Sequence, residues 1–267
     1  MNDENSHILK LYIYVTEDAL INILREKKLN ISRPWSTNDI TEAVKQREEK
    51  QQEKIKEYGY ICLSETCTSP AMWGYYADRS RGACLAFTFY VNTNDGKTFY
   101  VLDRKGQQFQ DAIEIKKVEY CKNRASSDNI DKLIFRKSKD WSHEKEYRIK
   151  VDLATVDFIE TKDKLNRISY IFKTDLIMEY LRGIILGVNC KKEKSEIDGI
   201  IRSIKGGIIH DPIQVIRAKM DMAHFEFNVP TDEIPYESFV NNNYYDDEND
   251  DLSDQNGINF WNTPTDQ

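Results

Sequence analysis

Short stretches in which apolar and polar residues alternate run through most of the chain, and this period of two is typical of strands buried on one face. In the stretch 147–153, for example, four apolar residues alternate with Arg148, Lys150 and Asp152. An apolar run bracketed by glycines at 183–187 predicts instead a strand buried on both faces. The predicted strands are 9–15, 29–32, 60–64, 82–91, 98–102, 113–121, 147–153, 183–187, 213–218 and 225–229.

Helices are predicted where apolar residues recur at helical spacing. Thr16 caps the first helix, whose buried stripe includes Leu20, Ile23 and Leu24. Further helices are predicted over 39–58, 128–139, 175–181 and 192–205, the first of them charged and exposed. Residues 152–166 are polar and poorly patterned, which predicts an insertion or a hairpin loop. Because strands outnumber helices and several lie close together in sequence, the pattern predicts an α+β fold with a mixed, mostly antiparallel and possibly split sheet and peripheral helices.

Composition favours one domain followed by a tail. The chain has 267 residues, 40% of them hydrophobic, which is enough for a single α+β domain over 1–230. Residues 231–267 hold ten acidic residues and no Lys or Arg, so the net charge of −7 leaves +3 on residues 1–230. Two interpretations of this asymmetry stay open: a solubilising, partly disordered tail, or a tail that competes with a polyanion for a basic body.

The location and the cysteines can also be judged from the sequence. The chain has no apolar run long enough to span a membrane and no secretory signal, so we expect a cytoplasmic protein. Its five cysteines form an odd set without a C-x-x-C pair, which is typical of reduced, packed thiols. The four histidines are scattered without metal-ligand spacing, so we expect no metal site.

The segment 137–150 is the first candidate site, because it gathers charged and aromatic residues at the entrance to a predicted strand. Extending the strand register backwards places Glu144 and Glu146 on the same face as Arg148. Two carboxylates and a guanidinium would then lie together at the beginning of the strand. Two other interpretations remain: a solvated polar face, and a structural ion-pair cluster, with Trp141, that joins a helix to the strand.

The segment 72–82 is the second candidate. If it is helical, Trp73 and Tyr76 lie on one face, with Arg79 and Arg81 just beyond. Aromatic side chains beside arginines can stack on a base and bind phosphates. This platform supports an alternative function, a non-catalytic module that binds a nucleotide or a nucleic acid. Packing of both rings into the core would explain the same residues without any ligand.

Several motifs occur in an order that resembles a bacterial family known only as domain of unknown function 2971. The resemblance covers roughly 9–229, and its most specific part is the K-x-x-x-W-x-x-E-x-E-Y-R segment at 137–148. The other motifs are S-E at 64–65, W-x-x-Y-A-D at 73–78, G-x-x-L-x-F at 82–87, V-x-Y at 118–120 and I-I-L-G at 184–187. The family itself implies little about activity.

The order of strands and polar residues is also similar to the layout of ADP-ribosyltransferases. In those enzymes a Glu on a late strand holds the ribose of NAD, while aromatic side chains clamp the nicotinamide. The resemblance implies that Glu146 is this carboxylate and that Glu144 activates the acceptor, with charge stabilised where a cation develops. It further implies a substrate-binding set: Tyr14 and Ser64 at the ribose, Tyr76 or Trp73 stacked on the ring, and Arg148 paired with the pyrophosphate.

The function predicted from this layout is an NAD-consuming transferase or NAD glycohydrolase, acting as a toxin or defence effector in a bacterium or phage. NAD would be the substrate, and the acceptor could be a nucleic acid or a protein. The chain lacks a P-loop, a G-x-G-x-x-G and a G-x-S-x-G, which argues against a nucleoside triphosphatase, a Rossmann dehydrogenase and an α/β-hydrolase. A metal-dependent nuclease built on Asp140, Glu144, Glu146 and Lys150 is a further alternative, although the spacing is unusual.

Overall fold

The computed structural model describes residues 6–34, 56–102, 113–123, 130–162, 168–203 and 213–234. Most of the helix predicted over 39–58 and the acidic residues beyond 234 lie outside these ranges, so both stay predictions. The first tail residues are part of the domain, because Ile234 is buried against Gly183. In the described residues, no helix is long and apolar enough to cross a membrane.

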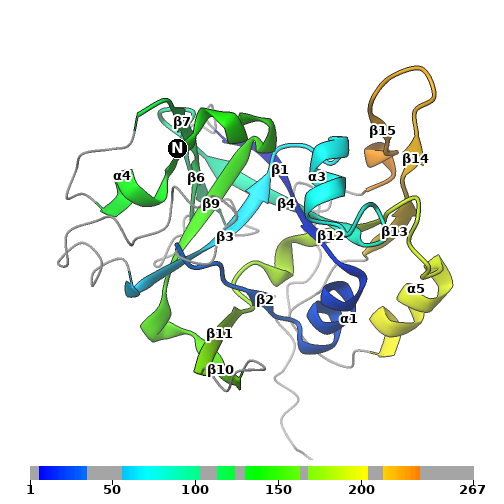
Figure 1. The fold of residues 1–267 in the computed structure, drawn as a ribbon, viewed down its shortest axis with the longest axis horizontal. Coiled ribbons are helices and arrows are strands. Elements are labelled where there is room, and N and C mark those ends of the chain that lie inside the picture. Colours follow the sequence, from blue (N-terminus) through cyan, green and yellow to red (C-terminus); the bar gives the residue numbers. More distant parts are fainter. Residues whose placement is uncertain are drawn as a thin grey trace, which may run out of the picture.

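Strands dominate the structure (Figure 1). They are β1 (Ser6–Val15), β2 (Leu29–Asn30), β3 (Tyr58–Ser64), β4 (Ala83–Asn92), β5 (Thr98–Val101), β6 (Glu114–Lys117), β7 (Glu119–Cys121), β8 (Arg136–Ser138), β9 (Glu146–Asp152), β10 (Asp157–Lys162), β11 (Ile168–Thr174), β12 (Leu181–Leu186), β13 (Gln214–Arg217), β14 (Lys219–Met220) and β15 (Phe227–Asn228). The helices are α1 (Glu17–Glu26), α3 (Pro70–Tyr75), α4 (Ile130–Ile134) and α5 (Lys194–Ser203), with 3-10 helices η2 (Lys139–Glu144), η3 (Leu153–Thr155), η4 (Met178–Tyr180) and η5 (Thr231–Glu233). The predicted α+β fold with a mixed, mostly antiparallel sheet is confirmed.

The main sheet closes on itself. Its strands follow the order β1-β3-β9-β6-β5-β4-β12-β13, and β1 also pairs with β4 along its whole length. The pairings from β1 through β3, β9, β6, β5 and β4 therefore return to β1 and form a ring of antiparallel strands. β12 lies outside this ring: it pairs antiparallel with β4 on one edge and parallel with β13 on the other. The strand β12 is buried on both faces, as its apolar run predicted.

One face of the ring strands forms the main core. Alternate residues such as Leu11 in β1, Leu63 in β3 and Ile149 in β9 belong to one buried cluster. The stripe of α1 joins this cluster, and Thr16 caps the helix by accepting a hydrogen bond from the Ala19 amide at 3.2 Å. Because side chains alternate along a strand, the even-numbered residues of β1, β3 and β9 point to the opposite face. That face carries the polar strand residues of the candidate site.

One local prediction is wrong, and a second is wrong in part. The helix predicted over 128–139 ends at Ile134 in the described residues, because the next residues pair in parallel with β7 as strand β8. The segment 152–166, predicted as an insertion or a hairpin loop, does belong to a hairpin, but part of it forms strand β10, which pairs with β11. Phe158 and Ile159 lie on opposite faces of β10 and are both exposed, so this hairpin lacks the one-sided burial that makes a strand pattern readable.

Candidate functional site

Three of the neighbouring ring strands bring one polar residue each into a single row. Tyr12 in β1 lies opposite Ser64 in β3, and Ser64 lies opposite Glu146 in β9. Directly opposite residues have Cβ atoms about 5 Å apart. The register therefore places a phenol, a hydroxyl and a carboxylate side by side on the same face of the sheet.

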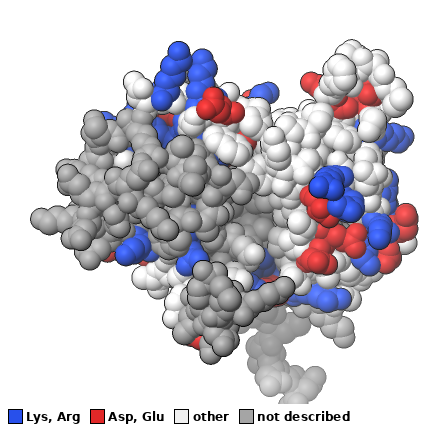
Figure 2. Space-filling model, in the orientation of Figure 1, with Lys and Arg blue, Asp and Glu red and all other residues white. Residues whose placement is uncertain are grey.

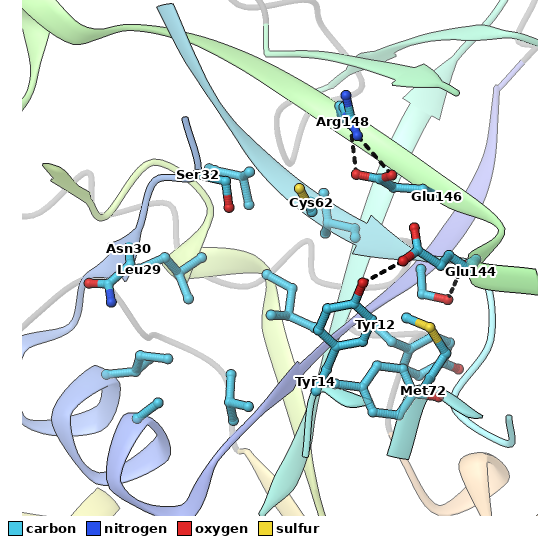
Figure 3. Close-up of a pocket in the computed structure, with 18 of the residues that line it drawn as sticks. Tyr12, Tyr14, Leu29, Asn30, Ser32, Cys62, Met72, Glu144, Glu146 and Arg148 are labelled. Atoms are coloured by element: carbon cyan, nitrogen blue, oxygen red, sulfur yellow. Dashed lines mark hydrogen bonds and ion pairs between the residues drawn. The ribbon is translucent and has the colours of Figure 1, made fainter. Parts of the chain in front are cut away.

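A cavity opens next to this row, because β1 and β3 diverge beyond the Tyr12–Ser64 pair. Tyr60 of β3 no longer faces β1 and instead exchanges two backbone hydrogen bonds, each 2.9 Å, with Ser32. The cavity between the diverging strands measures about 280 Å³. Figure 3 shows Glu146 and Arg148 on one side of it and Leu29, Asn30 and Ser32 on the other.

The cavity has charged side chains at one end and a mixed lining at the other, where Asn30 and Ser32 lie beside apolar residues. Its polar lining contains Ser64, Tyr76, Lys137, Glu144, Glu146 and Arg148. Its apolar lining comes from the first and third strands and from Ala19, Ile23 and Leu29. A mostly apolar pocket with a few convergent polar groups is the usual form of a small-molecule site.

Glu144 reaches the cavity from η2 and does not lie on the strand, so the predicted shared strand face of Glu144 and Glu146 is wrong. Ser138 caps this 3-10 helix, and Lys145 ends it in the left-handed region with φ 46°. The turn at Lys145 lets both carboxylates point to one place although they are two residues apart. The Ser64 hydroxyl fixes the turn by donating a 2.7 Å hydrogen bond to the Glu144 carbonyl.

Lys137 joins the two carboxylates. Its ammonium donates to Glu144 Oε2 and lies 3.1 Å from Glu146 Oε2. The Tyr76 hydroxyl donates to the other oxygen of Glu144. Each of the four side chains is buried or half-buried, and each lines the cavity. The arrangement is a charge-assisted network with a lysine at its centre.

Arg148 holds Glu146 in place. Its Nε lies 2.7 Å from Oε1 and its Nη2 lies 3.0 Å from Oε2, which is a bidentate pair. Its Nη1 donates to the Ile134 carbonyl, and the guanidinium lies 4.3 Å from the centroid of the Tyr60 ring. Arg148 is fully buried by these contacts. Arg148 therefore orients the carboxylate of Glu146, and because it also lines the cavity, its pairing with a pyrophosphate stays a prediction.

The network pushes the pKa values of the two carboxyls apart. Burial raises the pKa of Glu144 above its ordinary value, although Lys137 and the Tyr76 hydroxyl partly oppose this. Burial would also raise the pKa of Glu146, but the charges of Arg148 and Lys137 outweigh it and lower the pKa to about 2. Glu146 thus stays ionised, while Glu144 is suited to exchange a proton. Carboxyl pairs separated in this way are typical of acid–base sites.

The predicted stacking platform does not exist as one surface. Trp73 is fully buried, lies edge-on to Tyr14 at 5.2 Å between ring centroids, and donates to the Cys67 carbonyl at 2.8 Å. Its place is in the core, under α3, rather than at a binding surface. The reason is that α3 turns its Met72 and Trp73 side inward, where Phe227 also contacts the indole ring.

The remaining predicted residues are placed as follows. Tyr76 reaches Glu144 and lines the cavity, while Tyr14 lines the cavity and donates from its hydroxyl to the Thr66 carbonyl at 2.9 Å. Arg81 is exposed and pairs with Asp78 at 3.1 Å, so it is separate from the cavity lining. In the part of the chain that the structure describes, no group of three or more Asp, Glu, His or Cys side chains is arranged to hold a metal.

Three site residues were missed at the level of sequence. Tyr12, rather than Tyr14, lies opposite Ser64 in the row. Lys137 lies within the helix predicted over 128–139, yet β8 carries it to the centre of the charge network. Tyr120, from the neighbouring β7, accepts a 2.8 Å hydrogen bond from the Glu146 amide. The spacing of Lys137 before the E-x-E pair was the available signal, because a buried lysine near two carboxylates needs them as partners.

Comparison with known proteins finds a family similarity over part of this region. The model of a family described as protein of unknown function (DUF2971) matches residues 72–149. This range contains Tyr76, Lys137 and both carboxylates, so it covers most of the polar end of the cavity. No curated protein and no solved structure gives a significant match to the chain.

Proposed function

We propose that this protein is an ADP-ribosyltransferase-like enzyme that consumes NAD, as a transferase or as an NAD glycohydrolase. The observation that carries the proposal is the row of Tyr12, Ser64 and Glu146 across β1, β3 and β9, next to a cavity between diverging strands. This row supports the similarity to the ADP-ribosyltransferase layout, because it aligns an aromatic residue, a serine and a glutamate on neighbouring strands. Tyr12 occupies the position in the row that was predicted for Tyr14. A role as a toxin or defence effector is part of the proposal and rests on the resemblance alone.

The two carboxyls divide the chemistry. The glycosidic bond between nicotinamide and ribose would break with its electrons leaving on nicotinamide, which leaves a developing cation on the ribose. Glu146, held ionised by Arg148, would supply a fixed negative charge beside this cation. Glu144 would accept the proton of the attacking water or acceptor hydroxyl while that group's lone pair bonds to the ribose.

The shape of the cavity fits part of the dinucleotide. Its volume of about 280 Å³ is near the lower end of small-molecule sites, which begin at about 300 Å³. It would therefore take the nicotinamide and its ribose, with the ring toward Ile23 and Leu29 and the ribose toward Ser64. The adenylate half would lie outside this cavity.

A purely structural ion-pair cluster is the main competing interpretation. Replacing buried ion pairs by apolar residues is often neutral or stabilising, so such clusters are weak devices for stability alone. This network also lines a cavity instead of filling a closed core. Both points favour a functional role.

The test is nicotinamide release from NAD by the purified full-length chain, measured by chromatography. The Glu144→Gln variant keeps a partner for Tyr76 but cannot take a proton, and we expect turnover to fall about 100-fold or more. Glu119→Gln is the matched control, because Glu119 is exposed and pairs with Arg136 at 3.0 Å on β8. It should retain wild-type turnover.

Ser64→Ala tests the row without altering a charge, and its melting temperature shows that the variant has folded. We expect a loss of NAD turnover larger than any change in stability explains. If the wild-type chain neither binds nor cleaves NAD, the proposed function is wrong. If Glu144→Gln turns over NAD like an active wild type, the role assigned to Glu144 is wrong.

A further inference from the structure

An aromatic platform lies on the surface beside the site. It consists of Tyr75 on α3 and of Trp141 and His143 on η2. Tyr75 is 67% exposed, and its ring centroid lies 6.2 Å from that of His143. The centroids of Trp141 and His143 are 6.0 Å apart at an interplanar angle of 30°. Two exposed rings and one half-buried ring thus face solvent next to each other.

The platform is joined directly to the charge network beneath it. Tyr75 precedes Tyr76, and His143 precedes Glu144, so each exposed ring is the chain neighbour of one partner in the Tyr76–Glu144 hydrogen bond. The Lys137 ammonium lies 5.1 Å from the Trp141 ring centroid. Any molecule stacked on the platform would lie beside the residue that we propose to transfer protons.

Three exposed lysines lie next to η2, along the chain or across the β7–β8 pairing, and are called the lysine rim here: Lys122, Lys139 and Lys145. Lys139 begins η2, and Lys145 follows its last residue. Lys122 follows Cys121, which pairs with Ser138 at the start of η2. Figure 2 shows Lys and Arg side chains projecting at the top of the molecule, over the end where Figure 1 places β7.

The acidic residues in this region are largely engaged. Glu65 pairs with Lys117 and Glu119 with Arg136, each at 3.0 Å. Asp140 contacts the Ser138 hydroxyl at 3.2 Å as part of the η2 cap. The lysine rim therefore leaves a positive balance around the rings.

We propose that the aromatic platform binds unpaired bases of a single-stranded nucleic acid, whose phosphates the lysine rim contacts. Interleaved rings and cations are the features that bind single strands, because every base has a flat face and every nucleotide a negative charge. A peptide partner would gain no comparable match from three lysines around three rings. The surface is distinct from the predicted Trp73–Arg81 platform, whose indole is buried.

The inference also suggests the class of acceptor, and this part rests on the proposed function. A nucleotide stacked on Tyr75 and His143 would present a base or sugar group to Glu144. Binding and turnover are nevertheless separate measurements. Nucleic-acid binding without NAD cleavage would support the platform and refute the proposed enzyme activity. NAD cleavage without nucleic-acid binding would support the enzyme activity and refute the platform.

The experiment is fluorescence anisotropy of a labelled oligothymidylate titrated with the full-length chain in the absence of NAD. We expect binding that Tyr75→Ala and His143→Ala each weaken about tenfold, the typical loss for one stacked base. Phe225→Ala is the control, because Phe225 is 100% exposed on the turn between β14 and β15. It should bind like the wild type.

A second readout tests the lysine rim. The double variant Lys139→Gln and Lys145→Gln should lower the slope of log K against log salt concentration by about 1.4, since each lost phosphate contact on a single strand contributes about 0.7. Equal binding by wild type and Tyr75→Ala, tighter binding of duplex than of single strand, or no anisotropy change at low salt would each overturn the proposal.

Discussion

Replacing Lys137 by methionine tests whether this residue organises the charge network. Methionine keeps most of the buried volume but removes the ammonium between Glu144 Oε2 and Glu146 Oε2. Arg148 still neutralises Glu146 in the variant, whereas Glu144 loses its ion pair and keeps the hydrogen bond from the Tyr76 hydroxyl. The perturbation therefore falls mainly on Glu144.

The magnitude follows from burial. Removing one partner of a buried ion pair costs about 3–5 kcal/mol when the other charge stays ionised. Lys137 is the strongest influence that lowers the pKa of Glu144 against its burial, so this pKa rises further in the variant. When the folded pKa of a carboxyl is raised, its contribution to the free energy of unfolding is fully present below the unfolded pKa. This contribution is lost as the pH rises through the folded pKa. The cost of Lys137→Met relative to the wild type should thus be large near pH 8. It should shrink by about 1.4 kcal/mol per pH unit as the pH falls from the folded pKa of Glu144 in the variant to its folded pKa in the wild type.

Urea unfolding followed by tryptophan fluorescence, at several pH values between about 5 and 8, measures this difference. Lys150→Met is the matched control, because Lys150 pairs with Asp131 at 2.7 Å but is one-third exposed. Its cost should be at most about 1 kcal/mol and should not change over this range. A pH-independent cost for Lys137→Met, or one no larger than that of Lys150→Met, would refute the role assigned to Lys137.

Four further variants probe the same fold. Glu146 has a folded pKa of about 2, below its unfolded value of 4.5, so its ionised form contributes about 3 kcal/mol of stability above the unfolded pKa. This contribution is lost as the pH falls toward 2. The stability of Glu146→Gln, measured by urea unfolding, should therefore fall less steeply than that of the wild type over this range. Arg148→Lys cannot keep the bidentate pair, and we expect its urea midpoint to fall by an amount equal to about 2 kcal/mol. Gly187→Ala would bring a Cβ within 2.2 Å of the Ser80 carbonyl oxygen and lower the melting temperature, whereas Gly199→Ala, with open space in α5, should raise it.

Alternation predicted the ring strands because one face of each strand is buried in a single cluster. The stretches at 82–91 and 60–64 became β4 and β3 with shifts of one or two residues at their ends. Closure of the ring was not predictable, since it depends on β1 pairing with β4 and also meeting β3 at Tyr12 and Ser64. Such long-range pairings leave no local pattern. The strands of the β10–β11 hairpin were missed for a different reason, because exposure on both faces removes the alternation of apolar and polar residues.

The site was partly predictable, because its residue types are unusual for the positions they occupy. Glu144, Glu146 and Tyr76 were identified from chemistry, and the structure brings all three to the cavity. Their geometry was not identified, because the left-handed turn at Lys145 breaks the strand register on which the prediction depended. Trp73 was misplaced since an aromatic residue near arginines has the same local sequence whether it faces a ligand or the core.

A compensating variant separates a charge network from a packing defect. In Lys137→Met combined with Glu144→Gln, the unpaired charge is gone, and the amide can still bond the Tyr76 hydroxyl. If the cost of Lys137→Met comes from the stranded carboxylate, the double variant should be more stable near neutral pH than Lys137→Met alone, by about 2 kcal/mol, and insensitive to pH. If the cost comes from lost packing of the lysine stem on Trp141, the two changes should add instead. The sign of this coupling energy therefore decides whether Lys137 acts on Glu144 through its charge or merely fills the space between η2 and β9.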